Sequence, residues 1–451
     1  MTPRLPARWR PPGGVLAALA ALVALGGCVH GALPDAAVPS PTITPGLAIA
    51  YPAGRTPLIE AAETAFRRQP TRARLESLPP GALIRYRPIA ARAYRLSHVQ
   101  AGAWQFVYRS TDAHGTPVAD TATLLIPPAP AHRLVAYQVA YDALNRRCAP
   151  SREILNGTMI EQWFVSKALA RGWPVLLTDH EGPDLAYLAG HNAAHAVLDG
   201  IRAARTFMPG LLDAVDTRIG LWGYSGGAFA SLWAAQQAAR QDDDLLIAGV
   251  AAGGPPADLL ASARHIDGSG FAGVYFQAVL GLARAHPEID LDTLLNDRGR
   301  TMRARLSQSC LGQELAGVRD PLLSGYSFKH MHDYTTVDDL LTVPAVRRVA
   351  SANRLGEQPL AVPLYYYQGW FDPLTPRDQA RALARRYCAH GTAVRFDWAL
   401  GGHLLPAISH ADKALAFLAA RFADRPVDDG CAAILSRWSP TTGTHAGPNR
   451  R

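Results

Sequence analysis

The sequence predicts an α/β fold, in which a mostly parallel central sheet is flanked by helices and a helical cap is inserted between two core strands. From about residue 160, short apolar runs typical of buried strands alternate with longer helix-forming runs, as in successive βαβ units. Earlier segments that alternate apolar and polar residues predict antiparallel strands. The alternation of strand and helix stops over residues 256–350, where helical segments alone predict the inserted cap.

The antiparallel strands should open the folded part of the chain. A short helix over 56–69 precedes them, and the Pro-Pro-Gly turn at 79–81 prevents its continuation. The predicted strands are 93–99, 104–110, 119–126 and the more continuously apolar 134–141.

The strand–helix units then follow in order, and they require a sheet with helices on both faces. Gly172 provides the stop signal for the first helix. The expected segments are helix 160–171, strand 173–178, helix 192–207, strand 218–222, helix 226–240, strand 247–252, strand 362–368, helix 377–389, strand 393–398 and helix 408–422.

The interruption contains an apolar helical stripe, which we interpret as the core of the cap itself. Some of its residues could still face an acyl chain. The stripe consists of Phe271, Val274, Tyr275, Ala278, Val279 and Leu282. An insertion at this point of the chain should cover the carboxyl ends of the core strands.

These observations divide the chain into consecutive segments. We expect a signal peptide at 1–28, a tether at 29–57, the first part of the core at 58–255, the cap at 256–350, the second part of the core at 351–434 and a disordered tail at 435–451.

The N-terminus has the features of an export signal. Arginines at positions 4, 8 and 10 precede an apolar run, 15–25, that is short for a membrane span. The run leads into Leu25-Gly26-Gly27-Cys28, which resembles a bacterial lipobox and predicts lipidation of Cys28 and a membrane anchor. Val29 then favours the outer membrane, and simple cleavage to a periplasmic or secreted protein is the alternative.

Composition excludes several classes of protein. Among 451 residues, 48% are hydrophobic and 18% charged, which is typical of a well-packed globular chain and not of a disordered one. The net charge of +8 comes from scattered arginines without a compact basic run, so we expect no nucleic-acid partner. We expect a monomer.

Export also gives meaning to the remaining cysteines. Without Cys28, four are left, and an even number in an oxidising compartment predicts two disulfides. Four cysteines allow three pairings. We favour Cys148–Cys310 and Cys388–Cys431, the latter because both members lie in the C-terminal part of the chain; free, buried cysteines are the alternative.

The stretch 221–228 contains a candidate nucleophile, Ser225, between a strand and a helix. Gly223 and Gly227 flank it, and glycines are needed there because the sharp turn leaves no room for Cβ atoms. The N–H of Gly226 would then lie at a helix N-terminus, where it could bind an oxyanion. The alternative is a glycine-rich turn with a solvent-facing serine.

A serine nucleophile needs a base, and the base needs an orienting acid. Asp372 directly follows strand 362–368, and His403 follows strand 393–398 in a loop with paired glycines. Their order after the serine fits a Ser–Asp–His triad. Asp397 and His410 are the competitors for the two roles, and a plain turn aspartate is the other explanation of Asp372.

No spacing in the sequence predicts a metal site, and we expect neither metal nor cofactor. The cysteines lack the spacing of zinc ligands. His191 and His195 lie four apart on a predicted helix, but no third ligand accompanies them.

Several motifs together resemble one family, the secretory lipases typified by the yeast lipase A group, which are capped α/β-hydrolases. The resemblance extends from about residue 79 to 431. The motifs are 137–151, with its Tyr-Asp and Cys-Ala-Pro-Ser, Asp-His-Glu-Gly at 179–182, 197–203, Gly-Tyr-Ser-Gly-Gly at 223–227, Ala-Gly-Gly-Pro at 252–255, 368–372 and Gly-His at 402–403.

This resemblance implies an α/β-hydrolase fold with Ser225 as nucleophile, Asp372 as acid and His403 as base. It also implies an oxyanion hole formed by Gly226 and Asp142, and it supports both proposed disulfides. His180 stands where the family often has tyrosine, a departure that could change substrate contacts.

The sequence therefore predicts a serine hydrolase of carboxylic esters, namely a triacylglycerol lipase or carboxylesterase acting through an acyl-enzyme. Lipids or other esters are the expected substrates. One alternative is an acyltransferase or an esterase of non-lipid esters with the same triad. A non-catalytic envelope lipoprotein is the other alternative.

Overall fold

The computed structural model describes residues 49–50, 60–95, 97–212, 215–241, 245–310 and 325–437. The predicted signal peptide with Cys28, most of the tether and the tail from residue 438 lie outside these ranges. No helix within these ranges is both long and apolar enough to cross a membrane.

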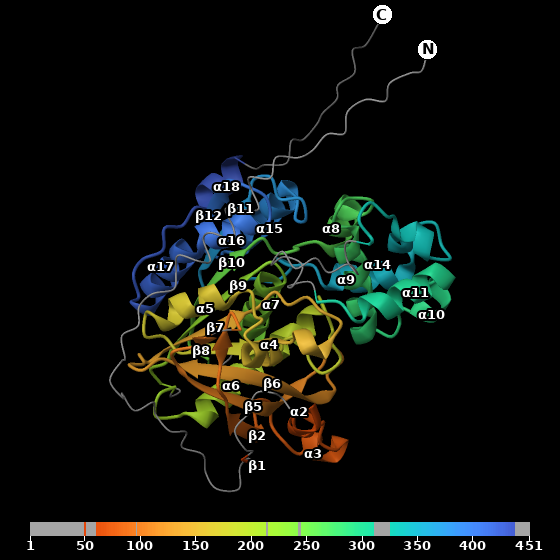
Figure 1. Cartoon of the computed structure of the whole chain (residues 1–451). Coiled ribbons are helices and arrows are strands. Elements are labelled where there is room, and N and C mark those ends of the chain that lie inside the picture. The colour runs from red at the N-terminus through yellow and green to blue at the C-terminus, as the bar shows by residue number, and fades with distance from the viewer. Residues whose placement is uncertain are drawn as a thin grey trace, which may run out of the picture. The chain divides into compact units, whose positions relative to one another are not determined.

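The predicted α/β architecture is confirmed. Within the described residues, one sheet of ten strands has the order β1-β2-β5-β6-β8-β7-β9-β10-β11-β12 (Figure 1). Neighbours from β8 to β12 are all parallel, whereas β2, β5, β6 and β8 pair antiparallel. The strands are β1 (Ile49–Ala50), β2 (Leu83–Pro88), β5 (Gly102–Thr111), β6 (Pro117–Ile126), β7 (Arg133–Gln138), β8 (Val175–Thr178), β9 (Arg218–Tyr224), β10 (Ile247–Gly253), β11 (Leu364–Gly369) and β12 (Val394–Ala399).

The N-terminal part differs from the expectation in three places. Strand β2 was not predicted, and β1 lies inside the expected tether because its backbone pairs with β2. The strand expected at 93–99 is divided into β3 (Arg92–Ala93) and β4 (Ser97–His98). Tyr94 and Arg95 between them have φ angles of 51° and 62°, which no extended strand tolerates.

Helices cover both faces of the sheet because successive strand residues point to opposite sides. On β9, Leu221 packs in the cluster that includes α6 (Gly190–Phe207), α7 (Gly226–Gln241) and α15 (Arg377–Ala389). The next residue, Trp222, packs instead in the cluster of α4 (Pro150–Asn156), α5 (Gln162–Leu169) and α17 (Ala411–Phe422). Strands buried on both faces account for the continuous apolar runs of the sequence.

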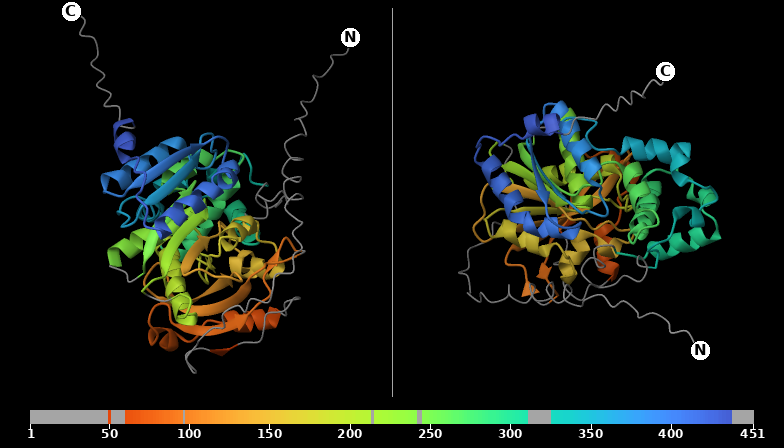
Figure 2. Two further views of the ribbon diagram at one scale, coloured as in Figure 1. Left: turned by 90° about the vertical axis from the view of Figure 1, so that its left-hand side faces the viewer. Right: turned by 90° about the horizontal axis from the view of Figure 1, so that it is seen from above.

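The chain between β10 and β11 forms the helical insertion, and Figure 2 shows its helices gathered to one side of the sheet. Its core is aromatic: the ring of Phe276 lies 5.8 Å from Tyr326 and 5.2 Å from Tyr334. The elements are α8 (Leu259–Ile266), α9 (Ala272–Ala285), α10 (Leu291–Leu294), α11 (Asp297–Leu306), η2 (Met331–Tyr334), η3 (Leu340–Thr342) and α14 (Pro344–Ala352).

The C-terminal part departs from the prediction twice. The helix expected at 408–422 is two helices, α16 (Leu404–Ser409) and α17, separated at His410. Helix α18 (Cys431–Arg437) continues past the boundary set at residue 434, because Ile434 is buried and Cys431 is bonded to α15. The remaining helices are α2 (Glu60–Arg67), α3 (Arg72–Glu76) and η1 (Arg146–Cys148).

Two disulfides occur, in the pairing that the sequence favoured. Cys148 bonds Cys310 with Cα atoms 5.6 Å apart, and Cys388 bonds Cys431 with Cα atoms 5.3 Å apart. The first joins η1 of the core to Cys310, which follows α11 in the insertion. An isolated bridge between Ala143 and Cys310 lies beside it.

The Cys148–Cys310 bond should contribute more to stability than the local Cys388–Cys431 bond. It spans 162 residues against 43, and a longer loop restricts the unfolded chain more. We expect the double variant Cys148→Ser/Cys310→Ser to lose about 2–4 kcal/mol of unfolding free energy. Thermal unfolding measures the loss, and Cys388→Ser/Cys431→Ser is the control. An equal or smaller loss than in the control would contradict this prediction.

Candidate active site

Ser225 lies at the sharp junction between β9 and α7, with a φ angle of +52°. Two glycines make the turn possible. A Cβ on Gly223 would come within 2.4 Å of the Gly227 carbonyl, and one on Gly227 within 1.9 Å of the Gln138 carbonyl oxygen. The Ser225 N–H donates to the Gly253 carbonyl over 2.8 Å, which holds the turn against β10.

His403 reaches the serine from the loop after β12. Its Nε2 lies 2.8 Å from Ser225 Oγ, so the hydroxyl can donate its proton to the imidazole. The Tyr224 hydroxyl donates to the carbonyl of His403, and the two rings lie 5.3 Å apart. His403 itself is buried, which limits the positions available to the ring.

Asp372 orients the histidine from the loop after β11. Its Oδ2 accepts a hydrogen bond from His403 Nδ1 over 2.7 Å. The Gln368 amide and the Thr375 hydroxyl also donate to Oδ2, while backbone N–H groups of Leu374 and Thr375 donate to Oδ1.

The electrostatic balance keeps Asp372 ionised. Burial acts to raise the pKa of this carboxyl, but the charge of His403 and the hydrogen bonds outweigh it, so the pKa lies below its ordinary value. A fixed negative charge at this place holds the proton of His403 on Nδ1 and leaves Nε2 to face the serine.

The structure thus brings together Ser225, Asp372 and His403, and it separates them from their competitors. Asp397 accepts hydrogen bonds from Tyr365 and Lys413. His410 contacts Lys413 as well, and both competitors therefore belong to another polar group.

Asp142 lies directly against the turn that contains Ser225. A Cβ on Gly226 would come within 1.9 Å of Asp142 Oδ1, so only glycine allows the carboxyl group to lie there. Asp142 has a φ angle of +40°, a conformation that non-glycine residues seldom adopt. The first N–H groups of α7 have no partner within the helix and carry its positive partial charge.

Burial raises the pKa of Asp142 to about 7, although the charge of His403 and a hydrogen bond with Tyr187 act in the opposite direction. Its Oδ1 has no hydrogen-bond partner among the described residues. The carboxyl group therefore carries a proton over much of the acidic and neutral range.

Three supporting residues were missed by the sequence analysis. Gln277 of α9 donates from Nε2 to the Asp142 carbonyl, and Glu181 accepts from the next N–H, that of Ala143, over 3.2 Å. Glu161 accepts from the Tyr137 hydroxyl over 2.7 Å, and burial raises its pKa to about 8. A glutamine within the apolar run 271–282 was the one available signal in the sequence, and the structure buries Gln277 fully.

Two of the histidines singled out in the sequence, His180 and His191, pack against aromatic side chains. His180 is buried with its ring 5.0 Å from Tyr141, and burial lowers its pKa to about 3, so it is neutral. His191 packs on Trp233 with ring centroids 4.9 Å apart. Neither His191 nor His195 belongs to a group of potential metal ligands within the described ranges.

Comparison with known proteins gives consistent matches. A family model described as secretory lipase matches residues 152–430. A Mycobacterium tuberculosis protein described as a probable inactive lipase is 32% identical over 367 residues, covering 78% of this chain and 80% of that protein. A secreted triacylglycerol lipase of Malassezia furfur is 30% identical over 372 residues, covering 79% of this chain and 75% of that protein.

The fold has a close counterpart among solved structures. Lipase A of Candida antarctica superimposes with a TM-score of 0.74 at 26% sequence identity. The superposition covers 82% of this chain and 88% of that structure.

The pKa of Asp142 predicts how stability changes with pH. Because the folded state raises this pKa from 3.8 to about 7, it binds the proton more tightly than the unfolded state does. The stabilising contribution is complete below pH 3.8 and is lost as the pH rises to 7. The unfolding free energy of Asp142→Asn relative to that of the wild type should therefore rise by about 1–3 kcal/mol from pH 5 to pH 8.

Thermal unfolding at both pH values measures this gain. Asp378→Asn is the control, because the Asp378 side chain is 93% exposed. A difference between Asp142→Asn and wild type that does not change with pH would refute a protonated Asp142.

Proposed function

This chain belongs to the secretory lipase family and is a carboxylic ester hydrolase, and we propose that it cleaves esters through an acyl-enzyme on Ser225, as a triacylglycerol lipase or carboxylesterase. One relative is described as a probable inactive lipase, so the proposal rests on the site of this chain itself. The observation that carries the proposal is the unbroken hydrogen-bond chain from Ser225 Oγ through His403 to Asp372.

In the first half-reaction, His403 Nε2 takes the proton of Ser225 as Oγ attacks the ester carbonyl carbon. The carbonyl oxygen becomes an oxyanion, which the N–H groups of Gly226 and Asp142 bind. The imidazolium is stabilised by Asp372. His403 then gives its proton to the leaving alkoxide, and the alcohol departs.

The second half-reaction repeats these roles with water. His403 removes a proton from water, which attacks the acyl-enzyme carbonyl, and the same two N–H groups bind the second oxyanion. Protonation of Ser225 Oγ then releases the carboxylic acid. Apart from the ester and water, these reaction steps use only side chains and backbone groups of the protein.

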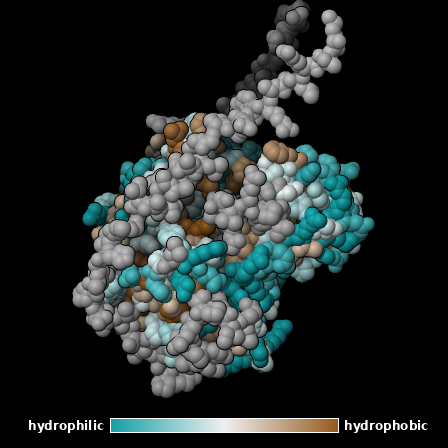
Figure 3. Space-filling view, viewed as in Figure 1, coloured by the Kyte–Doolittle hydropathy of each residue, from teal (hydrophilic) through white to brown (hydrophobic). Residues whose placement is uncertain are grey.

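Exposed apolar side chains near His403 support a lipid or another apolar ester as substrate. Phe371 is 67% exposed and Leu400 is 78% exposed, and several residues of α16 share this surface. These residues of α16 are Leu404, Leu405 and Ile408. Figure 3 shows hydrophobic surface on this face, in the region where α16 lies in Figure 1. Such a surface can accept an apolar substrate from an aggregate.

The protein is exported, as its secreted relatives are. We further propose that Cys28 carries a lipid anchor in the outer membrane. Together with the apolar surface near α16, an anchor of this kind would hold the enzyme at membranes and lipid aggregates.

Substitution of the nucleophile tests the proposed reaction. Ser225→Ala removes only Oγ and should lower kcat for nitrophenyl esters by about 10⁴-fold or more, because no other group can form the acyl-enzyme. Initial-rate kinetics measures the change, and circular dichroism verifies the fold. Ser231→Ala is a matched control, since Ser231 lies on α7, which begins directly after Ser225, and its hydroxyl donates to the Gly227 carbonyl. Substantial activity in Ser225→Ala would disprove the assignment.

Substitution of the apolar surface tests the type of substrate. Leu400→Glu should slow hydrolysis of emulsified triacylglycerol about tenfold, because a charge disfavours contact with the aggregate, while soluble short-chain esters are cleaved at the wild-type rate. Val215→Glu is the control: Val215 is 80% exposed and precedes β9 at the end opposite Ser225. Equal losses on both substrates would argue against a lipid-contacting surface.

A further inference from the structure

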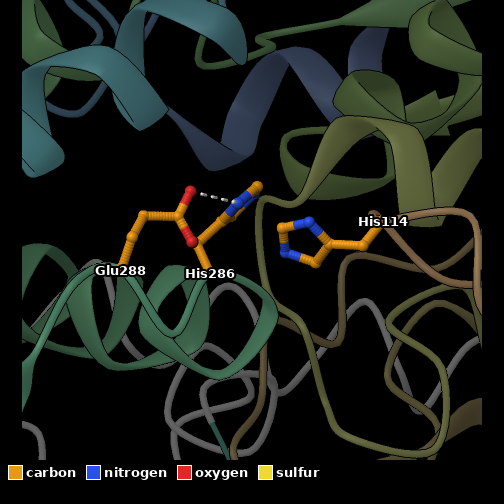
Figure 4. A group of neighbouring side chains, drawn as sticks. All are labelled: His114, His286 and Glu288. Carbon is orange, nitrogen blue, oxygen red and sulfur yellow. Dashed lines mark ion pairs between the residues drawn. The ribbon is translucent and has the colours of Figure 1, made fainter.

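Two histidines and a glutamate from distant parts of the chain converge at the boundary between the core and the insertion. His114, His286 and Glu288 each offer a ligand atom, and these atoms all lie within 4.8 Å of one another (Figure 4). The group is the only one of its kind in the described ranges, and it lies outside the Ser225 triad.

The three residues come from two separately folded elements. His114 lies in the turn that joins β5 to β6, where Asp112 Oδ1 accepts its N–H over 2.8 Å. His286 and Glu288 directly follow α9 of the insertion, on either side of Pro287. Any ion held by all three residues would connect the hairpin of the core to the end of this helix.

His286 has no other role that accounts for its position. Both of its ring nitrogens are buried, and neither has a hydrogen-bond partner among the described residues. Nδ1 lies 3.4 Å from Glu288 Oε1, which is an ion-pair distance longer than a well-formed hydrogen bond. The His286 ring lies 5.2 Å from the His114 ring, but buried ring nitrogens without hydrogen bonds are costly unless something else occupies the lone pair.

One ring nitrogen of His114 is fixed by a backbone carbonyl, as in many metal-binding histidines. Its Nε2 lies 2.7 Å from the Ala285 carbonyl oxygen, which can only accept, so Nε2 carries the proton. Nδ1 therefore keeps its lone pair. A carbonyl that fixes the second nitrogen is the usual outer partner of a histidine ligand.

We propose that His114, His286 and Glu288 bind a zinc ion that ties the insertion to the core, with water as the fourth ligand. Two imidazoles and a carboxylate are a donor set that zinc accepts. Tetrahedral zinc with bonds of about 2.0–2.2 Å places its ligand atoms roughly 3.3 Å apart. The 3.4 Å between His286 Nδ1 and Glu288 Oε1 already matches this spacing, and the ligand atom of His114 lies within 4.8 Å of both residues.

The protonation states suit a cation. Burial lowers the pKa of His286, so its ring is neutral near pH 7. The pKa of Glu288 is also lowered: burial opposes this shift, but a backbone hydrogen bond and the two histidines outweigh it, so the carboxyl is ionised. A neutral imidazole and an ionised carboxylate are the forms that bind a metal ion.

Zinc at this position would act, through α9, on the loop that carries Asp142. The helix that ends at Ala285 also holds Gln277, which donates to the Asp142 carbonyl, and Arg284, which donates to the Leu144 carbonyl over 3.0 Å. Fixing the end of α9 to the hairpin would therefore stabilise the helix that supports this loop. The role is structural, and the metal takes no part in the hydrolytic steps.

The test uses the purified full-length protein after removal of metal with EDTA and dialysis. Addition of ZnCl₂ should give one bound zinc per chain by calorimetry and raise Tm by about 3–5 °C at saturation, because the ion binds only the folded state. CaCl₂ is the comparison ion and should have no effect, since calcium requires oxygen ligands. Failure of zinc to bind, or an equal shift with calcium, would overturn the proposal.

Variants locate the site. His286→Ala, His114→Ala and Glu288→Gln should each lose the zinc-dependent rise in Tm, whereas His132→Ala, an exposed histidine outside the cluster, should retain it. Cobalt(II) provides a readout that does not depend on folding, because tetrahedral cobalt bound to the wild type should absorb visible light and Glu288→Gln should not reproduce that spectrum. Zinc binding that persists in all three variants would place the ion elsewhere and refute the site.

Discussion

The contact between Ser225 and His403 depends on one strained turn. A φ angle of +52° costs a non-glycine residue about 1–2 kcal/mol, and the fold must supply that energy. It does so by packing the glycines at 223 and 227 against backbone that no side chain could approach, and by the hydrogen bond from Ser225 to Gly253. Without this turn the hydroxyl would point along the strand, away from the imidazole.

Sheet topology brings the other two side chains to the same place. Strands β9, β10, β11 and β12 are neighbours and parallel, so their carboxyl ends lie along one edge. Ser225, Asp372 and His403 each follow one of these strands. Residues almost 180 positions apart can therefore meet within hydrogen-bond distance, and the helical insertion adds Gln277, which donates to the Asp142 carbonyl.

Features that depend on local residue types or on the order of residues along the chain could be predicted from the sequence. The elbow glycines, the order of the triad and the helix at 377–389 all follow from spacing and composition, and the structure places them accordingly. The sequence could not predict contacts between distant segments. Nothing near Gln277 indicates that it reaches Asp142, and His114 and His286 lie 172 positions apart in the sequence, far outside any motif. Strand β2 was missed because its pairing with β5, and not its own pattern, makes it a strand.

The central claim is that Ser225 attacks the ester while the N–H groups of Gly226 and Asp142 bind the oxyanion. A crystal structure of the protein after reaction with an alkyl phosphonate tests it most directly, because the phosphoryl group resembles the tetrahedral intermediate. The account predicts a bond from phosphorus to Ser225 Oγ, with the phosphoryl oxygen about 2.7–3.1 Å from both nitrogens. Phosphorus bonded to another residue, or an oxygen that points away from both N–H groups, would contradict it.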